Sequence, residues 1–445
     1  MPLRNIANFG EQQQGSISIF GLFMLMACAI GGGLGLDVMS AMSTRTKLQV
    51  AADSAAHAAL IARQDFTEAE AKAIGVAIAQ MTLPTSKYGN TISAADIRFG
   101  TWDAANDVFT DAAGVDDAVL VSTRNVSARG NAMGTFFLRF VGMGSLDVVS
   151  ESVFETYIPT CFREGFVAEN TVDVQSNNTY GNGFCIHSND HVEINNGNTF
   201  MDGTIVSMPD KQDMVMPTDG MTSNPGISDA LRDGAYRLRI LDRINQIIAE
   251  VDDPTSIYFR SDYVTIDPLT GLPPARITLD RKNKLDSSYW VSGAVHEVWC
   301  NAPNQKIMFP ANEILTKGVL ITDCSVEFGS GSEIRDVIMV NTNTSDDSFG
   351  GASGATIGLD DGCSDGGGAQ LVTLGGMRFP SNLQIYGGQL IAAKSIEFAA
   401  RPDGIEGVSI LAGDQIDGSS LINVGFCGGA GMDNNFVAWY FRMAT

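Results

Sequence analysis

Six cysteines are the residues of this sequence whose types and spacing most clearly suggest chemistry. They are Cys161, Cys185, Cys300, Cys324, Cys363 and Cys427, whereas the seventh, Cys28, lies inside an apolar segment. None of them forms a C-x-x-C pair, which disfavours a zinc or thioredoxin-type site and favours disulfide bonds made in an oxidising compartment. We therefore expect the chain beyond residue 160 to lie outside the cytoplasm.

Two possible pairs of these cysteines share one spacing. Cys161 and Cys185 are 24 residues apart, and so are Cys300 and Cys324. This spacing is near one coil of a parallel β-helix, whose coils stack about 4.8 Å apart, close to the Cα separation of a disulfide. Each pair could therefore join two neighbouring coils. Coincidence is the alternative, and the sequence leaves the connectivity of the six cysteines open.

Histidines offer a second kind of candidate chemistry. His187 and His191 are four residues apart with Asp190 between them, a spacing that would form a metal-ligand pair on a helix. Their Asn, Ser and Gly neighbours instead indicate a turn between strands, where we expect exposed polar residues. His296, beside Glu297, falls in an alternating run typical of a strand. These patterns do not favour a metal centre.

Carboxylates on glycine-rich segments are the third candidate. Asp360-Asp361-Gly362 and Asp365-Gly366-Gly367-Gly368 resemble a loose calcium loop, and a glycine-rich turn at the edge of a solenoid explains them equally well. The sequence contains no Gly-x-Ser-x-Gly motif, P-loop or dinucleotide fingerprint, and no carboxylate series typical of a polysaccharide lyase or glycosidase. We predict a protein that is not an enzyme and has no cofactor and no metal site.

Length and charge limit the class of protein. The chain has 445 residues and a net charge of −23, with 48 Gly and 14 Pro. This length suits more than one folded unit, and the many glycines favour turns over long helices. We do not expect so acidic a chain without a basic run to bind nucleic acid, because phosphate contacts require clustered Lys and Arg.

The elements that position these residues begin with an uncharged segment, residues 15–36. A helix of this length matches the hydrocarbon core of a membrane, roughly 30 Å thick. A cleaved signal peptide, or a lipoprotein signal ending at Cys28, is the alternative. Residues 1–14 lack a basic cluster, and the apolar segment continues well past Cys28, so we expect a retained transmembrane helix with residues 1–14 as a short cytoplasmic arm.

An alanine-rich stretch from Asp37 to Gln64 contains no Gly or Pro and should continue the helix as a stalk. Small residues recur along one face of this stretch. That face comprises Leu48, Ala52, Ala55, Ala56 and Ala59. Such a stripe lets another helix approach closely. The second helix belongs either to a partner protein or to the following segment, residues 67–82.

Residues 15–38 and 47–59 together resemble the N-terminal segment of TadG-type proteins of the tight-adherence (Tad/Flp) pilus assembly system. In that family a Gly opens the apolar helix, an Asp closes it, and Leu-Gln-x-Ala-Ala-Asp-x-Ala-Ala follows. The matching residues here are Gly15, Asp37, Leu48, Gln49, Ala51, Ala52, Asp53, Ala55 and Ala56. His57 stands where the family usually has Ala. The resemblance implies a membrane-anchored component of pilus assembly.

This sequence lacks two motifs found in relatives of this group, and their absence restricts the role that the resemblance implies. Pilin-like members carry a Glu five residues into the processed helix, where this chain has Phe20. Some TadG-type chains carry a von Willebrand A domain with an Asp-x-Ser-x-Ser metal site, and this sequence has no such motif. The resemblance therefore implies a retained anchor, neither a fibre subunit nor a metal-dependent adhesin.

Short alternating segments at residues 97–102, 118–124, 135–137 and 146–154 extend the resemblance more loosely. Strands with one buried face show this alternation. Together with the stalk they predict a small α+β unit over residues 37–158.

Residues 159–445 consist of short β segments broken by Asn, Asp, Ser and Gly, such as 171–174, 191–194 and 389–392. Ser325-Val326-Glu327-Phe328 recurs as Ser395-Ile396-Glu397-Phe398, which fits coils of roughly 20 to 25 residues in a parallel β-helix. A β-sandwich is the alternative. Residues 209–300 interrupt the pattern with an insertion, in which residues 229–251 are expected to form an amphipathic helix.

The overall prediction is a mixed fold: a transmembrane helix and stalk, a small α+β unit, and a mainly-β domain that is a parallel β-helix with a helical insertion. We expect a single-pass protein of the bacterial inner membrane with most of the chain in the periplasm. Its expected partners are other Tad pilus membrane and periplasmic proteins and membrane lipid, with a surface glycan as a further possibility. The alternative function is a membrane-anchored carbohydrate-active β-helix enzyme or glycan-binding adhesin.

Overall fold

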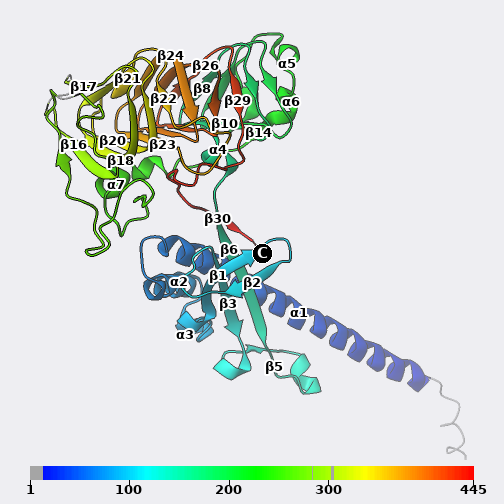
Figure 1. The fold of residues 1–445 in the computed structure, drawn as a ribbon. Helices are drawn as coiled ribbons and strands as arrows, with labels where there is room; N and C mark the ends of the chain where they lie inside the picture. The colour runs from blue at the N-terminus through cyan, green and yellow to red at the C-terminus, as the bar shows by residue number, and fades with distance from the viewer. Residues whose placement is uncertain (1–13, 283, 302–304, 445) are drawn as a thin grey trace, which may run out of the picture. The chain divides into compact units, whose positions relative to one another are not determined.

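The computed structural model describes residues 14–282, 284–301 and 305–444, which form two compact units. The first, here called the stalk unit, runs to Tyr157 and resumes at Trp439. The second, here called the solenoid, is Ile158–Ala438. Figure 1 shows both, coloured along the chain.

Two long helices begin the stalk unit. α1 spans Gln14–Ala62 as one continuous helix, and α2 spans Glu68–Thr82. α2 starts with a capping box, in which the Thr67 hydroxyl accepts a hydrogen bond from the Glu70 amide while the Glu70 carboxylate accepts one from the Thr67 amide. The long apolar helix expected at the N-terminus is thus confirmed. A short helix, α3 (Thr85–Tyr88), follows.

An antiparallel sheet completes the stalk unit. Its strands, in spatial order, are β2 (Val108–Asp111), β1 (Ile97–Asp103), β3 (Ala118–Asn125), β6 (Val148–Tyr157) and β30 (Tyr440–Met443). β4 (Met133–Gly134) and β5 (Ser145–Leu146) form a separate small pair. Three 3-10 turns lie between these strands: η2 (Ala94–Asp96), η3 (Ser127–Arg129) and η4 (Leu138–Val141). Strands 118–125 and 148–157 lie where the alternating residues predicted them.

The final strand of the chain belongs to this sheet. β30 pairs antiparallel with β6, with Tyr440 opposite Tyr157 and Met443 opposite Phe154. The sequence had placed residues 439–445 in the β-rich domain, whereas the structure returns them to the stalk unit. The solenoid is therefore inserted between two neighbouring strands of one sheet.

The solenoid is built from parallel strands stacked in three columns. The first column, in spatial order, is β14 (Leu231–Asp233), β13 (Ile205–Met208), β10 (Cys185–Ser188), β7 (Gly165–Ala168), β27 (Ser409–Ala412), β25 (Gln389–Ala392), β23 (Ala369–Thr373), β20 (Glu333–Asn341), β18 (Ile314–Thr322), β16 (Ala294–Val298) and β15 (Ile277–Thr278). The second is β11 (His191–Ile194), β8 (Thr171–Val174), β28 (Gln415–Asp417), β26 (Ile396–Glu406), β24 (Met377–Tyr386), β21 (Phe349–Gly351), β19 (Ser325–Phe328) and β17 (Lys306–Phe309).

The third column combines short strands with halves of longer ones. It contains β12 (Thr199–Phe200), β9 (Thr179–Tyr180), β29 (Asn423–Gly425), β22 (Thr356–Ile357) and the remaining parts of β26, β24, β20 and β18. The predicted parallel β-helix is confirmed, and the β-sandwich alternative is wrong because these pairings are parallel. Apolar side chains from all three columns meet in one continuous buried core.

The chain joins the solenoid in the middle of the stack. β7, its first strand, lies between β10 on one side and β27 on the other. From β7 the chain builds coils outward to β14, crosses to the far end at β15, and returns coil by coil to β27. The first coils of the solenoid thereby pair with its last coils, and the chain enters and leaves the solenoid at adjacent coils.

The repeated tetrapeptides occupy equivalent places. Val326 is in register with Phe349, Phe349 with Met377, and Met377 with Ile396. The segments 325–328 and 395–398 therefore lie in one column, and their similarity reflects the same environment in a coil.

The expected helix over residues 229–251 is wrong for most of its length. The structure has α6 (Ile227–Ala230), then strand β14, then η6 (Leu241–Arg243) and a short helix α7 (Ile244–Glu250). β14 extends the first column by pairing with β13, so tertiary pairing outweighs the helical pattern there. Three further short turns are α4 (Thr160–Arg163), η5 (Lys211–Asp213) and α5 (Gly220–Ser223).

Candidate functional site

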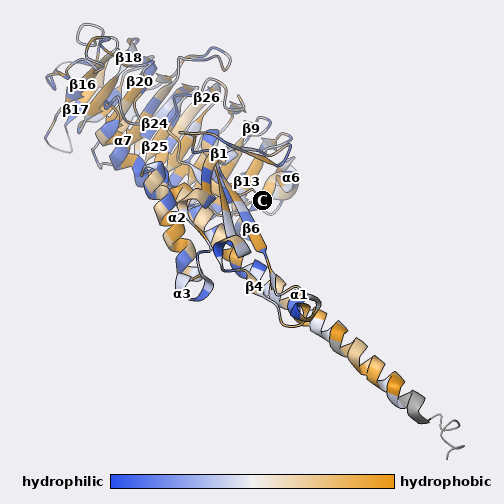
Figure 2. Cartoon of the chain, turned by 90° about the horizontal axis from the view of Figure 1, so that it is seen from below, coloured by the Kyte–Doolittle hydropathy of each residue, from blue (hydrophilic) through white to orange (hydrophobic). Residues whose placement is uncertain are grey.

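The first candidate site is the free part of α1. Within the residues that the structure describes, one helix is long and apolar enough to cross a membrane, and it begins near the N-terminus. Figure 2 shows this part of α1 as mostly hydrophobic and extending away from the rest of the stalk unit. Its large apolar side chains are exposed, among them Phe20, Phe23, Leu25 and Ile30. In water this surface would be unfavourable, whereas lipid would cover it.

Asp37 closes the apolar segment, and its carboxylate holds a distant loop. Its Oδ1 accepts a hydrogen bond of 2.6 Å from the Phe136 amide, and its Oδ2 accepts bonds of 2.9 Å from Phe137 and 2.7 Å from Leu138. The Asp37 side chain is completely buried. Because these three amides begin the 3-10 turn η4, their partial positive charge stabilises the carboxylate.

A glycine one turn before Asp37 makes room for the same loop. A Cβ atom on Gly33 would lie 2.3 Å from Cγ of Phe137, so no other residue fits there without displacing the ring. Gly31, Gly32 and Gly35 would meet nothing within 4 Å in this chain. Gly33 is therefore required for a contact within this chain, whereas the surface of α1 at the other three glycines is uncovered.

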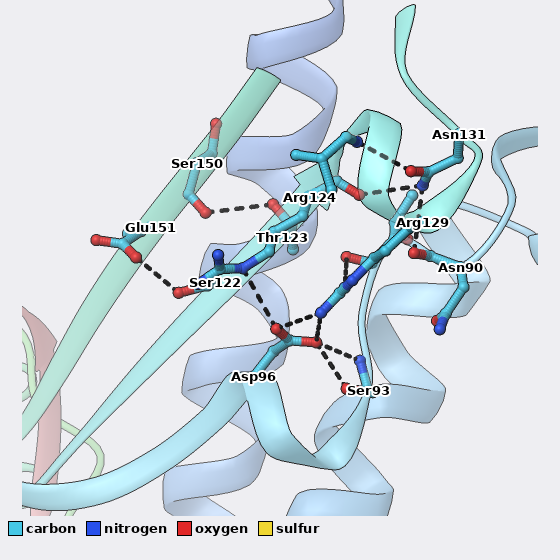
Figure 3. A network of polar contacts seen from close by, with 12 residues as sticks. Asn90, Ser93, Asp96, Ser122, Thr123, Arg124, Arg129, Asn131, Ser150 and Glu151 are labelled. Atoms are coloured by element: carbon cyan, nitrogen blue, oxygen red, sulfur yellow. Dashed lines mark hydrogen bonds and ion pairs between the residues drawn. The ribbon is translucent and has the colours of Figure 1, made fainter. Parts of the chain in front are cut away.

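The base of this loop is fixed by a polar network, drawn in Figure 3. Arg129 donates bonds of 2.7 and 2.8 Å to the two carboxylate oxygens of Asp96. Ser93 donates two more, from its amide and its hydroxyl, and Arg124 lies 3.4 Å away. Burial opposes ionisation of Asp96, but the Arg129 and Ser93 bonds outweigh it and lower its pKa. Asn131 adds bonds to the backbone of Tyr88 and Arg124.

The alanine stripe packs inside the stalk unit. Leu48, Ala52, Ala55, Ala56 and Ala59 are buried, together with Ala51. They share one core with Ala71 and Ala79 of α2. The helix that packs against this stripe is α2 of the same chain, which is one of the two alternatives expected from the sequence.

The remaining residues of the family motif have local roles. Gln49 donates hydrogen bonds to the Asp53 carboxylate and to the Glu151 carbonyl of β6, which tie α1 to the sheet. Gly15 lies in the first turns of α1. His57, the departure from the motif, contacts the rings of Phe154 and Phe441. The returning strand β30 therefore explains an aromatic side chain where the family has Ala.

Three disulfides involve all six cysteines beyond α1. Cys161 is bonded to Cys185, Cys300 to Cys324, and Cys363 to Cys427, with Cα separations of 4.7, 5.2 and 5.7 Å. The first two links join neighbouring coils across the 24-residue spacing noted in the sequence. The third closes 64 residues, a pairing that no spacing argument indicated. Cys28 has a free thiol.

The structure does not bring the histidines together as ligands. His187 is completely buried in β10, where its Nδ1 lies 2.8 Å from the Ser207 hydroxyl and its Nε2 lies 3.0 Å from Asn189. Burial lowers its pKa. His191 lies in β11 and bonds to its neighbours Asp190 and Glu193. The expected exposed turn is therefore wrong for His187, which lies in a strand with its ring buried against that of Tyr236.

His296 matches the expectation of a strand residue. It is buried in β16, where its ring stacks on Trp290 with centroids 4.1 Å apart. Burial lowers its pKa to about 4, so the imidazole is neutral at physiological pH.

A row of carboxylates runs along the second column of the solenoid. Glu397, Asp417, Asp173 and Glu193 are in register on four successive strands. Gln175 donates hydrogen bonds to both Asp173 and Asp417. The pKa of Asp173 is raised first by burial and then by repulsion from Asp417 and Glu193. The pKa of Asp417 is raised by burial and by Glu397. We call this set the carboxylate row.

The glycine-rich acidic segment borders a cavity of about 490 Å³. Its charged lining residues are Asp262, Lys317, Asp336, Asp365 and Asp433. Within the part of the chain that the structure describes, the groups of three potential ligands close enough for one metal ion consist of a disulfide pair with Asp323 or Glu406. The local bond from the Ser364 amide to the Asp361 carboxylate instead fits a turn.

Sequence reasoning missed the loop that Asp37 holds. Residues 135–137 were expected in a strand, but they lead into η4 and lie outside the sheet. The partners of Asp37 are backbone amides, which carry no side-chain signal. The available indication was the mostly apolar composition of residues 130–146, which include no acidic group.

Comparisons with known proteins identify both parts of the chain. Residues 165–428 match the model of a domain of unknown function, DUF7867. Residues 15–70 match the model of the TadE/G-like Flp pilus-assembly family, which agrees with a TadG-type protein. No curated protein matches the chain. The chain therefore belongs to the DUF7867 family, whose model covers its solenoid, and carries a TadE/G-like Flp pilus-assembly segment at its N-terminus.

Proposed function

We propose that this protein is a non-enzymatic, membrane-anchored component of Tad/Flp pilus assembly. The observation that carries the proposal is the match of residues 15–70 to the pilus-assembly family, because this segment includes the exposed apolar part of α1. The apolar part of α1 lies in the bacterial inner membrane and holds the rest of the chain at its surface. The solenoid then extends into the periplasm.

A periplasmic location is supported by the cysteines. Disulfides persist in oxidising compartments and are rare in the cytoplasm of mesophiles. All three disulfides lie beyond α1, in the solenoid. Their presence on one side of the apolar helix supports an orientation with the solenoid in the periplasm.

Packing against other membrane helices is the proposed way in which the anchor acts. Gly31 and Gly35 are one turn apart on α1, and neither is covered by this chain. Two small residues at this spacing let helix backbones approach closely within lipid. Because Gly33 points to the opposite side of α1, toward Phe137, a partner helix on Gly31 and Gly35 would not displace the loop.

The test combines deletion of the gene with complementation. Strains lacking the protein should form few or no Tad pili by electron microscopy, and the unaltered gene should restore them. The double variant Gly31→Leu/Gly35→Leu should reach the membrane in normal amounts but fail to restore pili. Ile30→Phe, which enlarges an exposed side chain on the side of the helix away from Gly31 and Gly35, serves as the control and should restore them. Normal pili in the deletion strain would refute the proposal.

A second candidate function, binding or cleavage of a glycan on the solenoid, is favoured by the carboxylate row. Glycosidases use paired carboxylates of which one has a raised pKa, and Asp173 and Asp417 are such a pair in adjacent strands. Its test is release of reducing ends from bacterial cell-wall and capsular polysaccharides by the purified protein, together with sedimentation of the protein with those polysaccharides. Release or binding that Asp173→Asn abolishes would establish this function, and the absence of both would remove it.

A further inference from the structure

We propose that the loop of residues 135–144, here called the membrane loop, inserts into the lipid surface beside α1 and gives the protein a second membrane contact. The inference rests on the anchoring of α1 in the proposed function and goes beyond it, because neither family match includes these residues. The membrane loop contacts lipid at the boundary between headgroups and acyl chains.

The height of the loop is the first observation. Three backbone amides at its centre bind Asp37, the residue that ends the uncharged segment of α1. The Phe137 ring lies over Gly33, which is four residues nearer the middle of the apolar segment, or about 6 Å along the helix axis. The loop therefore lies beside the last turn of the apolar helix, at the depth where amphipathic segments enter a bilayer.

Exposure is the second observation. The side chain of Phe140 is 82% exposed and that of Phe136 is 66% exposed, and Met143 is also exposed. At the same height α1 exposes Leu34, Leu36 and Val38. The apolar surface of the loop therefore continues the apolar surface of the helix, and one solvent would cover both. For the helix that solvent is lipid.

Charge is the third observation. The protein has a net charge of −23, yet no acidic residue occurs between Arg129 and Asp147. Arg139, at the tip of the loop, is the single charged residue in that interval, and it is exposed. An arginine beside exposed phenylalanines can extend to lipid phosphates while the phenylalanine rings enter the hydrocarbon. A stretch without acidic groups also avoids repulsion from anionic headgroups.

Rigidity is the fourth observation. The loop is closed on itself by bonds from the Thr135 hydroxyl to the Met143 carbonyl and from the Met143 amide to the Leu138 carbonyl. Below it, the Ser127 amide bonds to Asp147 at 2.8 Å, and the Asp96 network of Figure 3 holds Arg129. The exposed rings are thus presented by an ordered support, so inserting them costs little ordering entropy.

The experiment measures the depth of a fluorescent probe in the full-length protein, reconstituted at low density in phosphatidylcholine and phosphatidylglycerol vesicles. Without reductant the native Cys28 is the one free thiol among the described cysteines, so a probe there reports the span. In a Cys28→Ala background, Phe140→Cys places the probe on the loop. Phe66→Cys is the matched control, because Phe66 is also an exposed phenylalanine of the stalk unit but follows the far end of α1.

Doxyl-labelled lipid should quench the probes at positions 28 and 140, and aqueous iodide should quench the probe at position 66. We expect quenching by doxyl lipid at position 140 to exceed that at position 66 by about threefold or more. Quenching by lipid at 28 but by iodide at 140 would refute the membrane loop and leave the anchor intact. No lipid quenching at 28 would refute the anchor itself. Protection of position 140 from both quenchers would mean that protein covers the loop, and would also refute the proposal.

Discussion

The carboxylate of Asp37 lies 2.7 Å from the backbone amide of Leu138, although 101 residues separate them in the chain. This bond and its two neighbours connect the end of the apolar segment to the loop that follows η3. Asp37 is thus both the residue that ends the apolar segment and the group that orders the nearest loop. This double role gives a physical reason for an aspartate at this place in the family motif.

Replacement of Asp37 tests this connection. Asp37→Asn removes the negative charge that three amides share, so the loop should open more often and make the peptide bond after Arg139 accessible to trypsin. In detergent micelles we expect cleavage after Arg139 to become about tenfold faster, as followed by mass spectrometry. Asp53→Asn, in the same helix, removes a negative charge but keeps an oxygen that can accept the bond from Gln49, and it should leave the cleavage rate unchanged. Equal rates for all three proteins would contradict the role of Asp37.

Gly33 and Gly35 should respond differently to the same substitution. Gly33→Leu places a side chain where Phe137 packs, so it should displace the loop and raise trypsin cleavage as Asp37→Asn does. A Cβ atom on Gly35 would meet nothing within 4 Å, so Gly35→Leu should leave the isolated protein unaffected. If both variants behave alike in micelles, the contact between Gly33 and Phe137 is not important for the loop.

The buried asparagines of the solenoid should contribute strongly to its stability. Oδ1 of Asn198 accepts a 2.9 Å bond from the amide of Asn178 in the next coil, and Asn198 is completely buried. Asn198→Ala leaves that amide without an acceptor and should lower the free energy of unfolding by about 1–3 kcal/mol. Urea denaturation followed by circular dichroism measures it. Asn195→Ala, at a half-buried position nearby, is the control, and an equal loss there would argue against a specific role for Asn198.

The disulfide between Cys300 and Cys324 should stabilise the far end of the solenoid. It closes a 24-residue loop between β16 and β18. Cys300→Ala/Cys324→Ala should lower the free energy of unfolding by about 2–4 kcal/mol, and the difference from wild type should vanish when both are reduced. Cys28→Ala removes the free thiol and should have no such effect. If the unfolding midpoint of the wild-type protein is the same with and without reductant, the disulfides do not contribute to its stability.

The carboxylate row should make stability depend on pH in a definite direction. The pKa of Asp173 is raised in the folded protein, which means that the folded state disfavours the ionised carboxylate. The ionised carboxylate therefore destabilises the folded protein, and this destabilisation is complete above the raised pKa. That effect disappears as the pH falls below the pKa of the unfolded chain, about 3.9. Asp173→Asn should therefore raise the melting temperature by about 1–2 °C at pH 7 and by nothing near pH 3.

The control for this measurement is Asp202→Asn, an exposed position on the turn after β12. It should change the melting temperature little at either pH. A lower melting temperature of Asp173→Asn at pH 7 would mean that the hydrogen bond from Gln175 outweighs the repulsion within the row.

Local patterns predicted the elements of this fold well. The expected strands at 171–174, 191–194 and 389–392 coincide with β8, β11 and β25, because alternation and turn residues are properties of the local sequence. A further signal was present but unused: Asn178-Thr179-Tyr180 returns after 20 residues as Asn198-Thr199-Phe200, at the bond between the two asparagines.

What could not be predicted depends on contacts between distant residues. The pairing of β27 with β7 joins Ser409 to Gly165, and no local pattern determines which two coils meet there. The return of β30 to β6 and the link between Cys363 and Cys427 are of the same kind. For the candidate site, the motif identified Asp37 and Gly15, whereas the amides that bind Asp37 belong to a segment with no matching side-chain pattern.

The place of β7 in the middle of the stack sets the order of events during synthesis. One edge of β7 has to stay unpaired until β27 is made, and β6 lacks its last neighbour until the ribosome reaches β30. Unpaired strand edges are the parts of a nascent chain most prone to aggregate. A chain that stops after β7 but before residue 409 therefore leaves two strand edges open at once, one on β7 in the solenoid and one on β6 in the stalk unit.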